Sequence, residues 1–539
     1  MNQRSRAIEQ AFQRVPALLA AGRLQDAAQS CQQILGAAPN HADTMSLLAM
    51  ATLRMGQPQT ATEWLNRAMQ QKPGAAAGYL VNCALTLLEL GHPEPALEAS
   101  RDALARKPGY AEALQAEGHA LSDLGQMEEA TAAYREALRL KPSLHDIQNN
   151  LALTLRALSR LDEAEPWFRQ AAAREPRDPI LRANHASLLK DLGRLDEAEA
   201  AYSTALQLSR PGTPVEAMVR YNLGILLLLA GRLAEGWPEY DWRFAAGIVP
   251  PRNFPQPLWA GEPLQGRTLL VHAEQGHGDA IQMARYVPMI AERGGKLVLQ
   301  AARPLLRLLS RTGVEVIETG EALPPFDLQC PLMSLPRAFA TTLETIPATM
   351  PYLTADPVRT AHWRNRVDEL PGLRVGLAWA GNPLDTTMDR RRSVPFDRLE
   401  PLAGLAGISF VSLQKDIPAS RLQSSALGRQ LHNWTDELHD FAETACLIEA
   451  LDLVIGVDTA VIHLAGALGR PVWLLNRADT DWRWLLGRDD SPWYPTLRQF
   501  RQPGAGDWDS VVLAVREALV LAVREALVLA VREAPVTAA

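Results

Sequence analysis

The turn HAEQGHGD, at residues 272–279, carries residue types that can do chemistry. Its glycines, Gly276 and Gly278, flank His277 and allow a backbone to approach a ligand closely. Asp279 opens the helix that follows, so its carboxylate could cap that helix. Aimed into a cleft, the same carboxylate could act as a general base and accept the proton of a hydroxyl group.

A second polar turn follows the apolar segment LRVGLAWAG. Gly381 and Asn382 come first, and a polar loop then carries Arg390, Arg391 and Arg392. Guanidinium groups complement the negative charge of a diphosphate leaving group. A run of solvated arginines would give the same pattern, so this turn is ambiguous by itself.

A third turn joins the apolar strand LDLVIGV to the helix VIHLAGALG through Asp458, Thr459 and Ala460. The start of a helix at the end of a strand offers backbone N–H groups and a helix dipole to a phosphate. Asp458 would repel a phosphate unless it capped the helix or bonded a hydroxyl group. The anion contact is therefore assigned to Thr459 and the amides after it, while His463 is either a donor contact or a core histidine.

The elements that must position these turns alternate between short apolar strands and helices from residue 267 onward. RTLLVHAE, KLVLQAA and VEVIETG are strand-like, and the segments between them have helical patterns. This order predicts a parallel sheet, and a second one begins near residue 370. We predict two Rossmann-like lobes, 246–365 and 366–512, with a ligand in the cleft at the carboxyl ends of their strands.

The first half of the chain is an internal repeat. Small residues of one turn recur 34 to 38 residues apart, at Gly22, Gly56, Gly91, Gly125, Ser159, Gly193 and Gly231. A second series runs in phase with them, at Pro39, Pro73, Pro108, Pro142, Pro176 and Pro211. This period resembles the tetratricopeptide (TPR) family, a helix-turn-helix unit, over about residues 8–245.

The array predicted for residues 1–245 is an α-helical superhelix with a long concave surface. It could serve as a scaffold or a dimerisation arm, or it could cradle an extended peptide. Amide side chains at nearly the same phase of their repeats favour the cradle, since they can donate to and accept from a peptide backbone. They are Asn82, Asn150, Asn184 and Asn222, although asparagine is common at this phase in TPR repeats generally.

The second half is similar to the heptosyltransferase-like glycosyltransferases, which have the GT-B fold, over about residues 232–510. The most specific segment is IGVDTAVIHLAGALGRPVWLL. The resemblance implies that the Gly278-Asp279 pair supplies the catalytic base and that Arg392, with two residues between it and Pro395, contacts the donor phosphates. The family's Asp-Thr-x-x-x-His pattern falls on residues 458–463. Arginines stand where a lysine and a tryptophan are usual in the family, which leaves the donated sugar open.

The joining of TPR repeats to such a domain resembles the O-linked N-acetylglucosamine transferases and the flagellin glycosyltransferases. The implied acceptor is a protein, such as flagellin or another surface protein. In FVSLQKD, Gln414 and Lys415 are similar to the pair that holds the nucleotide in the first of these groups, though an ordinary surface lysine fits as well. Two alternatives stay open: a transferase that acts on glycans or lipopolysaccharide, and a non-catalytic scaffold with a decayed transferase domain.

The implied mechanism is a direct, inverting displacement at the anomeric carbon that needs no metal and no cofactor beyond the nucleotide sugar. Asp479-x-Asp481 and Asp507-x-Asp509 match a loose metal-binding pattern, but neither follows an apolar strand as such sites do. A late aromatic group could stack on a base or sugar, or could pack in the core. It consists of Trp482, Trp484, Trp493 and Tyr494.

The composition sets further expectations. The net charge of −7 argues against nucleic acid as a partner. The four cysteines are scattered, as expected in a reducing compartment. The N-terminal segment lacks the apolar core of a secretory signal, and no stretch is apolar and long enough to span a bilayer. We therefore expect a cytoplasmic location.

The segment 513–539 repeats LAVREALV with an eight-residue period. On a helix this period drifts by about 80° per repeat, so no single face stays apolar. We interpret it as a separate, duplicated helical tail, and we expect deletion beyond about residue 520 to leave activity intact.

Overall fold

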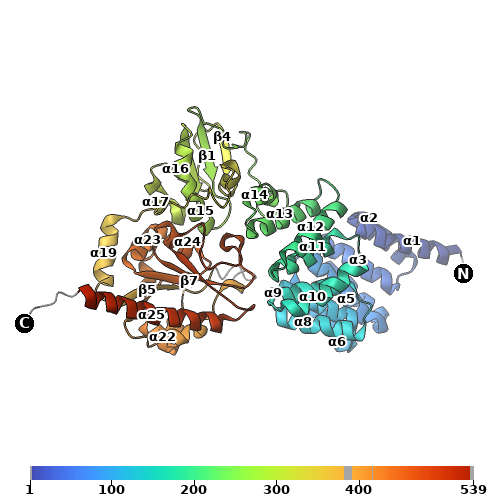
Figure 1. Ribbon diagram of the computed structural model, residues 1–539. Helices are drawn as coiled ribbons and strands as arrows, with labels where there is room; N and C mark the ends of the chain where they lie inside the picture. Colours follow the sequence, from blue (N-terminus) through green and yellow to red (C-terminus); the bar gives the residue numbers. More distant parts are fainter. Residues whose placement is uncertain (1–2, 382–390, 416, 534–539) are drawn as a thin grey trace, which may run out of the picture. The chain divides into compact units, whose positions relative to one another are not determined.

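The computed structural model describes residues 3–381, 391–415 and 417–533 (Figure 1). The chain divides into two compact units, an N-terminal unit of residues 1–176 and a C-terminal unit of residues 177–539. The division therefore lies within the repeats, and the predicted boundary at 245/246 lies inside the C-terminal unit. Each unit is described separately below.

The N-terminal unit consists of antiparallel helix pairs, as the repeat period predicted. Its turns fall on the predicted small residues, which adopt left-handed backbone angles: Gly56 has a φ of 75° and Ser159 a φ of 60°. Alanines such as Ala27 and Ala103 are fully buried between helices, because a small side chain lets helix backbones approach. The helices are α1 (Gln3–Ala20), α2 (Leu24–Ala37), α3 (Ala42–Arg54), α4 (Pro58–Gln71), α5 (Ala76–Glu89), α6 (Pro93–Arg106), α7 (Ala111–Asp123), α8 (Met127–Leu140), α9 (Asp146–Ala157) and α10 (Leu161–Arg174).

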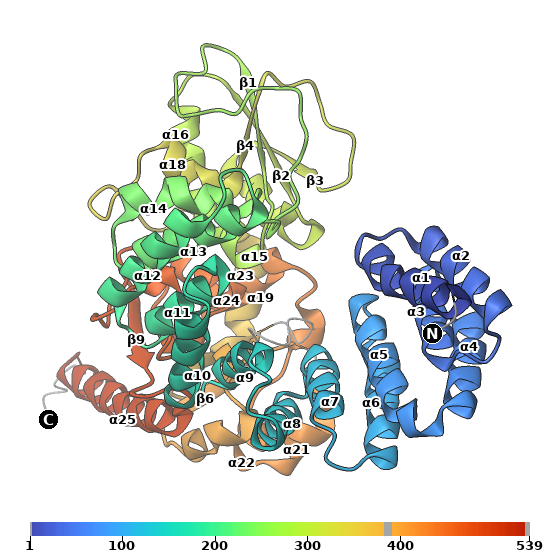
Figure 2. The same cartoon turned by 90° about the vertical axis from the view of Figure 1, so that its right-hand side faces the viewer.

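The C-terminal unit opens with the last repeats. Between Ala183 and Leu226 they form a hydrophobic cluster of their own, and from Leu228 to Tyr240 they share a core with the lobes that follow. Trp237 is 2% exposed and packs against Trp482 and Trp493 of the second lobe, at ring-centroid distances of 5.3 and 6.4 Å. Figure 2 shows these helices beside the α/β region of the same unit. They are α11 (Pro179–Asp191), α12 (Leu195–Leu208), α13 (Pro214–Leu229) and α14 (Leu233–Tyr240), followed by the 3₁₀ turn η2 (Asp241–Arg243).

The first lobe is a parallel sheet in the order β3-β2-β1-β4. Chain order reverses beside β1, so the turn after β1 lies at the switch point where such sheets bind ligands. The strands are β1 (Thr268–His272), β2 (Lys296–Ala301), β3 (Glu315–Glu318) and β4 (Leu328–Pro331). The helices are α15 (His277–Met283), α16 (Val287–Ala291), α17 (Leu306–Leu309) and α18 (Leu335–Ala338), with 3₁₀ turns η3 (Ala284–Tyr286), η4 (Arg303–Leu305), η5 (Ser310–Thr312) and η6 (Leu332–Ser334).

The second lobe is a parallel sheet in the order β6-β5-β7-β8-β9. Its switch point lies between β5 and β7, and both predicted donor-side turns follow these two strands. The strands are β5 (Leu373–Ala378), β6 (Ile408–Ser412), β7 (Leu453–Val457), β8 (Val472–Asn476) and β9 (Leu497–Arg501). The helical elements are α19 (Pro357–Val367), η7 (Phe396–Leu402), α21 (Ala419–Ser424), α22 (Ala426–Gln430), η8 (Thr435–Glu437), α23 (Phe441–Ala450), α24 (Ala460–Ala467), η9 (Trp482–Trp484) and α25 (Trp508–Glu533).

Helix α25 differs from the predicted tail. It begins at Trp508, before the repetitive segment, and Val515 and Leu519 are buried in the hydrophobic core of the second lobe. Val523 also reaches this lobe, since a Cβ built on Gly407 would lie 3.0 Å from its Cγ1. The first copy of the eight-residue repeat is therefore part of the second lobe and not a separate segment.

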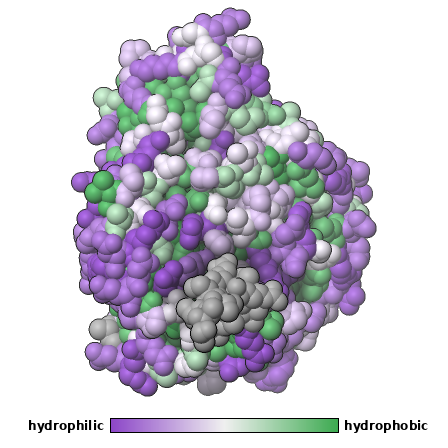
Figure 3. Space-filling model, turned by 60° about the vertical axis from the view of Figure 1, so that its left-hand side comes forward, coloured by the Kyte–Doolittle hydropathy of each residue, from purple (hydrophilic) through white to green (hydrophobic). Residues whose placement is uncertain are grey.

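Within the part of the chain that the structure describes, no helix combines the length and the apolarity that a bilayer crossing requires. On the face shown in Figure 3, hydrophilic residues cover much of the surface and hydrophobic ones form smaller areas between them.

Candidate active site

The turns after β1 and β7 meet in the C-terminal unit. A Cβ built on Gly278 would lie 2.8 Å from Cδ2 of His463 and 3.4 Å from Cα of Ala460. Only a residue without a side chain allows this approach of α15 to the start of α24. Two turns that the sequence analysis selected separately, about 180 residues apart, thus lie at one place.

Asp279 occupies the third position of α15, and its carboxylate has two partners. Oδ2 accepts a hydrogen bond of 2.8 Å from the backbone N–H of Gly276, and Oδ1 forms an ion pair with Arg483 of the second lobe. The side chain is 19% exposed. Asp279 therefore caps its helix, and it also faces the opposite lobe. His277, beside it, is exposed and lies against the ring of Phe441 at 5.4 Å.

Arg483 is a site residue that the sequence analysis missed. It lies in η9 and is 8% exposed. Nε donates to Oε1 of Gln282 at 2.7 Å, and Nη1 donates to Asp481 at 2.8 Å. Its guanidinium group stacks over the ring of Trp482 at 4.2 Å. The only sequence signal is an arginine between two tryptophans in DWRW.

Asp458 and His463 form a pair behind this contact, in which His463 is buried and the Asp458 side chain is 24% exposed. Nε2 of His463 lies 3.6 Å from Oδ1 of Asp458, and Nδ1 shares a hydrogen bond of 2.8 Å with the hydroxyl group of Tyr494. Burial raises the pKa of Asp458, but His463, the charge of Arg483 and the indole of Trp484 outweigh it, so the net pKa lies below its usual range. His463 is 4% exposed, so it contacts Asp458 from the side of the core.

Thr459 and Ala460 begin α24. The hydroxyl group of Thr459 donates to the carbonyl of Val457 at 3.2 Å, and its own carbonyl accepts from the N–H groups of Ile462 and His463. The threonine side chain is thus bonded back to the strand. The N–H groups of Ala460 and Val461, which come before these two, are the ones at the open start of the helix.

On the side of β5, Gln414 and Lys415 make contacts to the backbone. Oε1 of Gln414 accepts from the N–H groups of Trp379 and Ala380 at 3.2 and 2.9 Å, and Nζ of Lys415 donates to the carbonyl of Leu438 at 2.8 Å. The N–H of Gly381 donates to Ser393 at 3.0 Å. Gln414 therefore fixes the turn that carries Gly381. Two residues of the predicted donor site, Asn382 and Arg390, lie outside the described residues.

Arg391 and Arg392 are half-buried, so the described part of the arginine cluster is not a solvated run. Arg391 forms ion pairs with Asp479 and, at 3.1 Å, with Asp191 of α11. The side chains of Asp191 and Asp479 are 2% and 5% exposed. A helix of the repeats is thus bonded to the residue next to Arg392, the predicted phosphate ligand.

The carboxylates of the loose metal-binding pattern are paired with cations. Asp479 lies beside Arg391 and Arg477, and Asp481 beside Arg483. Over residues 3–381, 391–415 and 417–533, no group of three or more histidine, cysteine, aspartate or glutamate side chains is placed to hold a metal ion.

The late aromatic residues are core residues. Trp482, Trp484, Trp493 and Tyr494 are at most 3% exposed. Stacking on a base or sugar needs an accessible ring face, so the core-packing alternative describes these residues.

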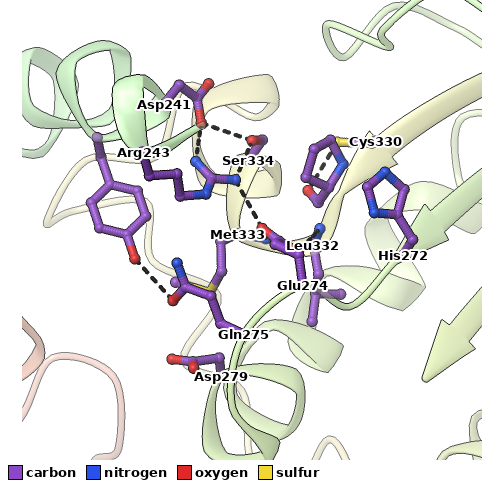
Figure 4. A network of polar contacts seen from close by, with 12 residues as sticks. Asp241, Arg243, His272, Glu274, Gln275, Asp279, Cys330, Leu332, Met333 and Ser334 are labelled. Atoms are coloured by element: carbon purple, nitrogen blue, oxygen red, sulfur yellow. Dashed lines mark hydrogen bonds and ion pairs between the residues drawn. The ribbon is translucent and has the colours of Figure 1, made fainter. Parts of the chain in front are cut away.

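A buried polar network ties η2 to the strand ends of the first lobe (Figure 4). The fully buried Arg243 donates to Asp241 at 2.5 Å and to Glu274 at 2.8 Å. Glu274 also accepts from the N–H groups of Leu332 and Met333 at 2.9 and 3.1 Å. The network fixes the turn between β1 and α15, and therefore the approach to Asp279.

His272, at the end of β1, is expected to make stability depend on pH. Burial, together with the nearby Arg252 and Arg243, lowers the pKa of His272 to about 4, against an ordinary value of about 6.5. Below pH 6.5 the unfolded chain binds a proton at this position that the folded chain does not. The free energy of unfolding therefore falls as the pH drops from about 6.5 to about 4, by on the order of 3 kcal/mol, and the effect levels off below that window.

Urea unfolding at a series of pH values measures this effect. The variant His272→Gln is expected to show a shallower loss of stability over the same window. An equal slope in both proteins would assign the pH dependence to other groups.

The predicted peptide-binding asparagines differ in their surroundings. In the N-terminal unit, Asn82 is exposed on α5, and Asn150 of α9 hydrogen bonds His119 at 2.9 Å. In the C-terminal unit, Asn184 and Asn222 are half-buried on α11 and α13.

Comparison with known families agrees with both resemblances. Three tetratricopeptide repeat models match residues 18–82, 75–211 and 184–240. The model of glycosyltransferase family 9 (heptosyltransferase) matches residues 438–484, a range that contains Asp458, Thr459, His463 and Arg483. The protein FlbA of Caulobacter vibrioides is 32% identical over 337 residues, which are 57% of this chain and 56% of FlbA. The chain thus spans about half the length of this curated relative.

Solved structures resemble the repeats. YrrB, described as a TPR protein with an unusual peptide-binding site, is 22% identical over 34% of this chain and 92% of its own, with a TM-score of 0.29. A TPR protein of Parabacteroides merdae is 22% identical over 45% of this chain and 94% of its own, with a TM-score of 0.35. The thermophilic TPR protein TTC0263 of Thermus thermophilus is 28% identical over 35% of this chain and 99% of its own, with a TM-score of 0.28.

Proposed function

For this bacterial TPR protein with a heptosyltransferase-like domain, we propose that it transfers a sugar from a nucleotide-sugar donor to a hydroxyl group of a protein acceptor. The observation that supports it most is the contact of Gly278 with the start of α24. It brings a carboxylate of one lobe and a helix start of the other to a single site.

The proposed reaction is a direct displacement, which inverts the anomeric carbon. The acceptor oxygen forms a bond to that carbon, the bond from the carbon to the phosphate oxygen breaks, and Asp279 takes the acceptor proton. Arg392 and the amides of Ala460 and Val461 stabilise the departing nucleotide phosphate, so positive charge comes from the protein and no metal is required. Gly381, Asn382, Gln414 and Lys415 would line the donor side.

The last repeat supports a polypeptide acceptor, because it reaches the turn that carries the proposed base. Tyr221 of α13 lies against Tyr240 at 5.5 Å, and the hydroxyl group of Tyr240 donates to Gln275 at 3.0 Å. Gln275 directly precedes the Gly276 turn. A polypeptide held by the repeats would therefore be delivered at the carboxyl ends of the first lobe's strands, with Asn222 on α13 and Asn184 on α11.

We place the reaction in the cytoplasm. The four cysteines, Cys31, Cys83, Cys330 and Cys446, are free thiols, as is usual in a reducing compartment.

The proposal is tested by incubating the purified protein with radiolabelled nucleotide sugars, one at a time, and a lysate as the acceptor source. Label in a protein band is the expected result, and a lysate without flagellin tests that acceptor. Label in lipid would favour a transferase that acts on lipopolysaccharide. Neither labelling nor donor hydrolysis with any nucleotide sugar would favour the non-catalytic scaffold.

A further inference from the structure

Arg483 crosses from the second lobe to the proposed base in the first. Its three guanidinium nitrogens have different partners: Nε binds Gln282, Nη1 binds Asp481 and Nη2 binds Asp279. Gln282 and Asp279 both lie on α15, one helical turn apart. A planar, rigid donor set therefore spans one face of the helix that presents the base.

We propose that Arg483 is a positioning residue that holds the carboxylate of Asp279 in the orientation from which it accepts the acceptor's proton. This inference rests on the proposed function. Arg483 donates to Oδ1 of Asp279, and the N–H of Gly276 donates to Oδ2. One donor on each oxygen fixes the plane of the carboxylate, and each oxygen keeps a second lone pair for the incoming hydroxyl group.

Arg483 is itself held rigidly. Its guanidinium group lies on the face of Trp482, and Trp482 packs edge-on against Trp237 of α14 at 5.3 Å and against Trp493 at 6.0 Å. Loss of the packing around Trp482 would therefore displace Arg483 and, through it, the carboxylate of Asp279. The last repeat reaches Asp279 through this short chain of contacts.

The local charges give Arg483 a second effect. Asp279 and Asp481 are ion-paired with it, and its charge also stabilises the carboxylate of Asp458. Three carboxylates thus share one guanidinium group in a largely buried space. Without it the carboxylates would repel one another, and Asp279 would turn toward solvent.

The test compares Arg483→Gln and Arg483→Lys with the unaltered protein. It uses the nucleotide sugar and the acceptor with which the unaltered protein is active. We expect Arg483→Gln to lower kcat about 100-fold, the size of loss that a misplacement of about 1 Å produces. The dissociation constant of the donor should stay within about twofold. Arg483→Lys, which keeps one donor toward Asp279, should recover about tenfold of the lost rate.

A matched control lies on the same segment. Arg488 also pairs with an aspartate, Asp490, at 2.5 Å, but its side chain is 31% exposed. Its described side-chain hydrogen bonds are to Asp490 and not to the turns of either lobe. Arg488→Gln should leave kcat unchanged.

The double variant Asp279→Asn/Arg483→Gln separates positioning from independent effects. Because Arg483 acts through Asp279, the double variant should be no slower than Asp279→Asn alone. Losses that multiply, or a weakened donor affinity with an unchanged kcat, would overturn the positioning role. The positioning role would also be overturned if Arg483→Lys recovered none of the lost rate and the loss in Arg483→Gln equalled the fraction of that protein that is unfolded. If the unaltered protein transfers sugar and Arg483→Gln does too, only this inference fails; if the unaltered protein transfers none, the proposed function fails and the inference with it.

Discussion

Asp279→Asn is expected to reduce the rate of sugar transfer by about 10²- to 10⁴-fold, the usual contribution of a general base. An amide has nearly the shape of a carboxylate but cannot take the acceptor's proton. Its oxygen can still accept the hydrogen bond that Gly276 donates to Asp279. The effect should therefore fall on kcat, and initial rates of label incorporation measure it.

Asp327 provides the matched control, because it accepts a backbone hydrogen bond of 2.8 Å from Thr268 at the opposite end of β1. Asp327→Asn should leave kcat within about twofold, although it can lower stability. An Asp279→Asn protein that keeps a fifth or more of the activity, with the donor bound normally, would show that a different group accepts the proton.

Trp237→Ala is expected to lower the free energy of unfolding of the C-terminal unit by about 3–5 kcal/mol, as for other large aromatic residues truncated in a core. Trp237 is 2% exposed, and its indole N–H donates to the carbonyl of Thr341 at 3.0 Å. Its removal leaves a cavity among Trp482, Trp493 and Tyr240. Unfolding in urea, followed by tryptophan fluorescence, measures the loss.

The control for this variant lies in the other compact unit. Trp64 of α4 is half-buried and stacks with Arg67 at 4.3 Å. Trp64→Ala should leave the urea transition of the C-terminal unit and the transferase activity unchanged. If both variants shifted that transition equally, Trp237 would not belong to a core that it shares with the lobes.

Local sequence patterns predict the repeat helices and the strand-to-helix turns, because neighbouring residues determine these features. The repeat turns need left-handed residues such as Gly56, and the period of these residues directly gives the helix pairs. The turns after β1 and β7 follow apolar strands, and each lies at the carboxyl edge of its own sheet. Because ligands bind at that edge, in the cleft between two such lobes, Gly278 and Thr459 were predicted to face one ligand.

The contacts that the sequence could not predict join distant residues. Arg483 is 204 residues from Asp279, and an arginine within DWRW has no local feature that points to its partner. The late tryptophans could pack in the core or bind a ligand, and only their contacts with Trp237 show that they pack. The repeat period is also the same on both sides of residue 176, because it records how helices pair and not what else they touch.

The packing of the C-terminal segment was likewise not predictable from its sequence pattern. The eight-residue period changes the face of the helix from one copy to the next, so periodicity alone suggested a separate element. In the structure, Leu519 is fully buried in the second lobe, while Leu521 is 56% exposed. Truncation before residue 520 would remove part of a folded core, whereas the expectation for truncation beyond it still awaits measurement.

The division of the chain at residue 176 has a consequence for how such proteins can diversify. The repeats up to that point form a compact unit, whereas the last repeat residues, from Leu228 to Tyr240, share a core with the lobes. Exchange of the first stretch for one of another length or surface would therefore leave the packing of the lobes unchanged. Under the proposed function, such an exchange would direct the same transferase site to new acceptors.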